Sequence, residues 1–73
     1  MSGLQSPKHP EELLDMYYNE MRSHLLEVAS AFDRIERQGG TDDARLTKLR
    51  ELARIAVDES PERAKRFQEY LSV

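Results

Sequence analysis

A seven-residue repeat of apolar side chains constrains the fold of this chain more than any other feature. No glycine or proline occurs from Glu11 to Arg37. The repeat predicts one amphipathic helix over about residues 10–37, roughly 42 Å long at 1.5 Å per residue. Two apolar series, offset by four residues, occupy its d and a positions: Leu14, Met21, Val28 and Ile35, then Tyr18, Leu25 and Phe32.

Turn and capping residues divide the rest of the chain into two shorter helices. Pro10 favours the start of the long helix, and Gly39 and Gly40 predict its end. Thr41 or Asp42 is expected to cap a second helix over about 42–57. A third helix is predicted over about 61–71, with Ser60 as its cap and Pro61 as its first residue. The sequence therefore predicts an all-α fold.

The second and third helices are expected to be amphipathic as well. Ile55 projects away from the apolar face that the spacing gives the second helix. In the third helix, acid-first pairs four residues apart, such as Glu62 with Arg66, are expected to add a little helix stability. The predicted apolar face of the second helix contains Leu46, Leu49, Leu52, Ala53, Ala56 and Val57.

The length of the chain bears on how the a and d residues of the long helix, which we call the seam, can be covered. Seventy-three residues form at most one small domain, and the absence of cysteine excludes disulfides and thiolate metal sites as a source of stability. Laid end to end, the two shorter helices would match the long one in a helical hairpin, whose two layers leave part of the seam uncovered. We therefore expect a homodimer that forms a bundle. The alternatives are a compact three-helix monomer that covers its own seam and association with a different protein chain.

These patterns predict a protein–protein interaction or scaffold module as the function. Met16, Tyr17 and Ile55 lie outside the seam, and soft or aromatic side chains of this kind often anchor interfaces. They are candidate partner-binding residues, although Tyr17 and Ile55 would equally serve packing within the chain. The predicted self-association surface is the seam itself, Leu14, Tyr18, Met21, Leu25, Val28, Phe32 and Ile35.

The sequence offers little basis for catalysis or metal binding. Glu20, His24 and Glu27 share one helix face, but di-iron bundles use Glu followed three residues later by His, and they use it twice. His9 could coordinate a metal or begin the helix cap, but a lone histidine in the predicted tail is expected to be solvated. There is no cysteine nucleophile, and acids follow Gly39-Gly40, where a phosphate would be repelled. We expect no enzyme activity, cofactor or metal.

Charge and hydropathy set the remaining expectations. Fourteen acids against eleven bases give a net charge of −3, which disfavours nucleic acid as a partner. The alternative function is a nucleic-acid-binding regulator that uses the second and third helices. No apolar run approaches a membrane span, and we expect a cytoplasmic protein with a flexible tail at 1–9 and one helical domain at 10–73. A nucleic-acid-binding surface on the second and third helices would use these basic residues: Arg45, Lys48, Arg50, Arg54, Arg63, Lys65 and Arg66.

Overall fold

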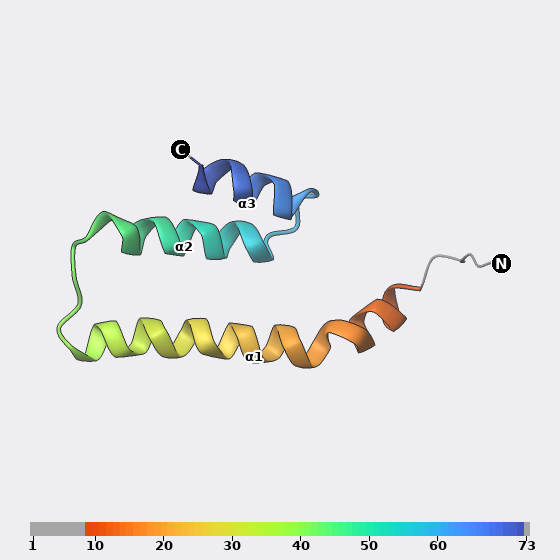
Figure 1. Cartoon of the computed structure of the whole chain (residues 1–73), viewed down its shortest axis with the longest axis horizontal. Helices are drawn as coiled ribbons and strands as arrows, with labels where there is room; N and C mark the ends of the chain where they lie inside the picture. The colour runs from red at the N-terminus through yellow and green to blue at the C-terminus, as the bar shows by residue number, and fades with distance from the viewer. Residues whose placement is uncertain (1–8, 73) are drawn as a thin grey trace. The chain divides into compact units, whose positions relative to one another are not determined.

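The computed structural model describes residues 9–72, and this part of the chain is all-α. It contains α1 (Pro10–Arg37), α2 (Ala44–Val57) and α3 (Arg63–Leu71), coloured from orange to blue in Figure 1. The predicted fold class is confirmed, and no helix boundary differs from its predicted position by more than two residues. The chain divides between Gly39 and Gly40 into two compact units, which are described separately. Residues 1–8 of the predicted tail lie outside the described part.

The first turn of α1 is closed as the sequence predicts. His9 is the N-cap in an extended conformation, and Pro10 follows as the first helical residue. The Glu12 side chain accepts a hydrogen bond from the His9 backbone N–H at 2.8 Å, and the His9 carbonyl accepts one from the Glu12 N–H at 2.9 Å. His9 is therefore the cap of α1, which was one of the alternatives that the sequence left open.

The C-terminal end of α1 depends on glycine. Gly39 and Gly40 have φ angles of +102° and +73°, in a region that L-residues rarely adopt. The Gln38 N–H donates to the Arg34 carbonyl at 3.2 Å, and the Gly39 N–H donates to the Glu36 carbonyl at 3.0 Å. These bonds satisfy carbonyls of the last turn, so the chain leaves the helix at the position where two successive glycines permit it.

A carboxylate caps α2 one residue later than predicted. Asp43, not Thr41 or Asp42, is the N-cap, and its Oδ1 accepts from the Arg45 backbone N–H at 2.9 Å. Thr41 instead accepts from the Asp43 N–H through its hydroxyl at 3.1 Å. The Asp43 carboxylate also binds the Arg45 guanidinium through both oxygens, at 3.0 and 2.9 Å. This two-point contact accounts for the choice of Asp43.

The α2 and α3 helices fold back on each other as a short hairpin (Figure 1). Leu52 and Ile55 are buried between them, with 4% and 8% of their surfaces exposed. Near the start of α2, Lys48 Nζ donates to the Leu71 carbonyl at 3.3 Å and lies 5.6 Å from the centre of the Tyr70 ring. The expectation that the two shorter helices lie end to end is therefore wrong.

The turn before α3 also differs from the prediction. Ser60 and Pro61 precede the helix, and the N-cap is Glu62, a left-handed residue with φ 59° and ψ 41°. Arg66 accounts for this, because its guanidinium donates to the Pro61 carbonyl at 3.0 Å and to the Ser60 carbonyl at 2.9 Å. Both carbonyls are thereby satisfied outside a helix, so α3 begins only after them.

Candidate interaction surface

The heptad seam of α1 is largely exposed. None of the 28 residues of α1, all of which the structure describes, is buried. Phe32 and Ile35, towards the C-terminal end, are half-buried. The other five seam residues each expose about half of their surface, from 46% at Val28 to 57% at Leu14. The seam is thus continuous along the helix, and none of its residues is buried.

The apolar face of α1 is wider than the seam. At 100° per residue, the face runs from Ala29 on one edge to Leu13 and Ala31 on the other, an arc of about 160°. A two-stranded coiled coil needs only the narrow a/d stripe, whereas a helix in a bundle uses a broader one. The heptad pattern did not predict Leu13 and Ala31 as members of this face, because it counts only the a and d positions.

Tyr17 belongs to this wider face, and Met16 lies apart from it. Tyr17 is 49% exposed and adjoins the seam at a g position, so the candidate partner-binding residue and the self-association surface are continuous. Met16 is 55% exposed on the outer side of the helix. Met16 and Tyr17 were both predicted as partner-binding residues, but they lie about 100° apart around the helix and do not share a face.

Ile55 is placed differently from the sequence expectation. It does not project into solvent but is one of the two buried residues of the α2–α3 hairpin. The physical reason is that α3 packs on the side of α2 that carries Lys48, Leu52 and Ile55. Most of the predicted apolar face of α2 consequently stays open: Leu49, Ala56 and Val57 are exposed, and Leu46 and Ala53 are half-buried.

The acidic and histidine side chains of α1 form no metal site. Glu20, His24 and Glu27 are all exposed along one flank of the helix. Across residues 9–72, no three His, Asp or Glu side chains gather closely enough to hold a metal ion. Nothing in this flank supplies the ring of converging carboxylates that a metal centre in a helical bundle requires.

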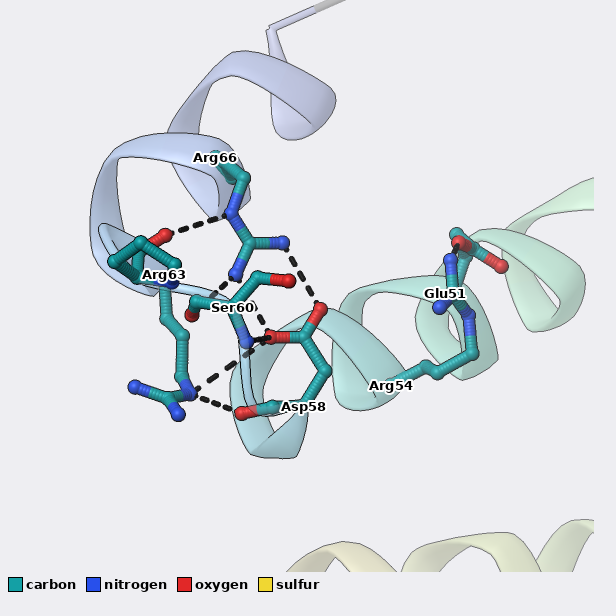
Figure 2. A network of polar contacts seen from close by, with 7 residues as sticks. Glu51, Arg54, Asp58, Ser60, Arg63 and Arg66 are labelled. Atoms are coloured by element: carbon teal, nitrogen blue, oxygen red, sulfur yellow. Dashed lines mark hydrogen bonds and ion pairs between the residues drawn. The ribbon is translucent and has the colours of Figure 1, made fainter.

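The main polar network of the second unit surrounds Asp58, at the end of α2. Figure 2 shows its carboxylate facing Arg66, whose two terminal nitrogens donate to it at 2.9 and 2.7 Å. The Ser60 N–H donates to the same carboxylate at 3.1 Å, and Arg63 donates to the Asp58 carbonyl. These contacts, first the bonds from Arg66, lower the pKa of Asp58 to about 2. We call this group the Asp58 clamp.

The basic residues of the predicted nucleic-acid surface have partners within the chain. Besides Lys48 and the two arginines of the clamp, Arg45 binds Asp43, Arg54 binds Glu51, and Lys65 lies 3.8 Å from Glu62. The bonds from Arg45 lower the pKa of Asp43 to about 2. Much of the positive charge is therefore neutralised locally, which reduces the potential available to attract a phosphate backbone.

Comparisons with known proteins give no relative from which a role could be transferred. Neither a protein-family model, nor a curated protein, nor a solved structure matches the chain. Within residues 9–72, no helix combines the length and the apolar character needed to cross a lipid bilayer.

Proposed function

We propose that this chain is a small helical interaction module that forms a homodimer through the seam of α1 and presents further surface to a protein partner. One observation carries the proposal: of the described residues, only Leu52 and Ile55 are buried, and both belong to the α2–α3 hairpin. The longest helix has no buried residue at all. An apolar face of this length is typical of a surface that another chain covers.

The free energy available from covering this face is substantial. Fully burying a side chain such as Leu or Met contributes about 1.5–3 kcal/mol. Leu14, Tyr18, Met21 and Leu25 each retain about half of their surface, so each has about 1 kcal/mol left to gain on association. A domain of this length has few other means of stabilising itself, because it contains no cysteine and buries so few residues.

The proposal is for a non-catalytic, cytoplasmic protein without cofactor or metal. It rests on the absence of a nucleophile–base pair or a carboxylate cluster in the sequence motifs, and on a composition rich in charged residues. Nucleic-acid binding by α2 and α3 stays the alternative. Only binding to mixed-sequence DNA that persists at about 150 mM salt would support this alternative, because exposed basic residues bind DNA weakly at low salt in any case.

Light scattering behind a sizing column tests the proposal directly. At tens of micromolar, the wild-type protein is expected to have twice the 8.5 kDa mass of the chain. Leu25→Asp places an unpaired charge in the middle of the seam and is expected to reduce the mass to that of the monomer. Ser23→Asp adds the same charge on the outward side of the same helix and is expected to leave the dimer intact.

The outcomes separate the homodimer from the monomer alternative. A folded wild-type protein with monomer mass would overturn the proposal and favour a chain that covers its own seam. A dimer that both variants weaken equally would also overturn it, because the site of the charge would then be irrelevant. Circular dichroism of each variant shows whether it is folded at the concentration of the measurement.

A further inference from the structure

The side chains along the apolar face of α1 change in size from one end to the other. The N-terminal half carries Leu14, Tyr17, Tyr18 and Met21, all large. The C-terminal half contains smaller members, among them Val28, Ala29 and Ala31.

An antiparallel pair of α1 helices matches these sizes better than a parallel pair. In an antiparallel register centred near residue 23, six of the seven seam residues find a seam partner, and Ile35 lies opposite Glu11. Tyr18 then lies opposite Val28 of the second copy, so a bulky residue meets a smaller one. A parallel pair instead places Tyr18 on Tyr18 and Phe32 on Phe32 at a positions, where well-packed dimers favour β-branched side chains. The antiparallel layers are Tyr18 with Val28, Met21 with Leu25, and Leu14 with Phe32, each formed twice.

The flank of the face fits the same register. In antiparallel helices, g positions lie opposite g positions. Tyr17 therefore lies opposite Ala31 of the second copy, whose small side chain leaves room for a ring. In a parallel pair the same two residues are about 14 positions apart, or roughly 21 Å along the axis, and do not meet.

Charge also favours the antiparallel arrangement. Residues 10–23 hold four acids and one base, a net charge of −3, while residues 24–37 hold three acids and two bases, a net charge of −1. A parallel pair brings both strongly acidic ends and both helix dipoles into alignment, which antiparallel pairing avoids. One contact opposes it: Arg22 lies near Arg22 of the second copy, at an exposed position where solvent screens the repulsion.

We infer that two copies of this chain pair their α1 helices antiparallel, about a two-fold axis near residue 23, with Tyr17 of each copy seated over Ala31 of the other. This inference rests on the proposed homodimer and specifies its geometry. The occupant of the α1 face is then a second copy of the same helix.

Spin labels on the outward side of α1 test the orientation. The chain has no cysteine, so a single cysteine takes one label, and Ser23, Ser30 and Asp33 are exposed sites on the side away from the seam. Antiparallel pairing gives axial label separations of about 0, 21 and 30 Å at these three sites. The distances from pulsed dipolar spectroscopy of the full chain are expected to increase in that order, whereas a parallel pair gives nearly equal distances.

This experiment distinguishes the two proposals. Three nearly equal distances in a protein of dimer mass overturn the antiparallel inference and leave the homodimer standing. A dimer in which no label senses its counterpart overturns both, since α1 then lies outside the interface. A monomer mass in light scattering removes the homodimer itself.

A size exchange tests the contact between Tyr17 and Ala31. Ala31→Phe is expected to weaken dimerisation about tenfold or more, because the added ring meets Tyr17 of the second copy. Adding Tyr17→Ala to this variant makes room for the ring and is expected to restore affinity to within about threefold of wild type. An Ala31→Phe variant that dimerises normally, or a double variant weaker than either single variant, overturns the contact.

Discussion

Replacing Leu52 with alanine probes the packing of the smaller unit. Leu52 is the most buried residue of the α2–α3 hairpin, with 4% of its surface exposed. Truncating a buried leucine costs about 2–5 kcal/mol, and the lower part of this range, about 2–3 kcal/mol, suits a thin two-helix unit that collapses readily around a cavity. A unit of about 34 residues has about 2–5 kcal/mol of stability in total, so the change removes most of it.

Circular dichroism at 222 nm measures this loss. The α2 and α3 helices hold 14 and 9 residues, beside 28 in α1, so unfolding of the hairpin is expected to reduce the helical signal by a little under half. Leu49→Ala is the matched control, because Leu49 lies three residues earlier on α2 but is 50% exposed. It is expected to cost about 1 kcal/mol at most. Equal losses in the two variants at low protein concentration would refute the packing described here.

Two further substitutions examine the turn between α2 and α3. The pKa of Asp58 is lowered to about 2 from 3.8, so its contribution is complete above about pH 4 and is lost as the pH falls through about 2. Asp58→Asn is expected to lower the thermal midpoint at pH 7 and to weaken the pH dependence between 4 and 2, where Asp43 titrates as well, while exposed Glu59→Gln changes neither. Glu62→Gly relieves the left-handed residue before α3 and is expected to stabilise the hairpin by up to about 1 kcal/mol, seen as a raised midpoint; a lowered midpoint would show that the φ of Glu62 carries no strain.

Local sequence signals predicted the helices well because those signals act within one turn. The heptad series, Pro10 and the two glycines fixed α1 at its observed bounds. The start of α3 was wrong because its determinant is not local: Arg66 reaches back eight residues to Asp58. The expected pairing of Glu62 with Arg66 assumed that the helix begins at Pro61, and the longer-range clamp prevailed.

Part of the candidate interaction surface could be predicted because it follows from the helical repeat of α1 alone. Periodicity placed the a and d residues of α1 correctly on one face, and the broader face that includes Leu13 and Ala31 follows from the same wheel when all apolar positions are counted. Ile55 could not be placed, because its burial depends on which side of α2 receives α3. That choice is made by the turn at residues 58–62, whose geometry no apolar pattern encodes.

Added salt is expected to act differently on the Asp58 clamp and on the apolar face of α1. The ion pair between Arg66 and Asp58 is half-buried, so concentrated salt screens it only weakly and is expected to leave the contact between α2 and α3 largely intact. The same salt strengthens contacts between apolar surfaces, especially when it is a sulfate. Raising the ionic strength is thus expected to change the stability of the α2–α3 hairpin little while strengthening the association of two chains along α1, and a single salt titration can follow both effects.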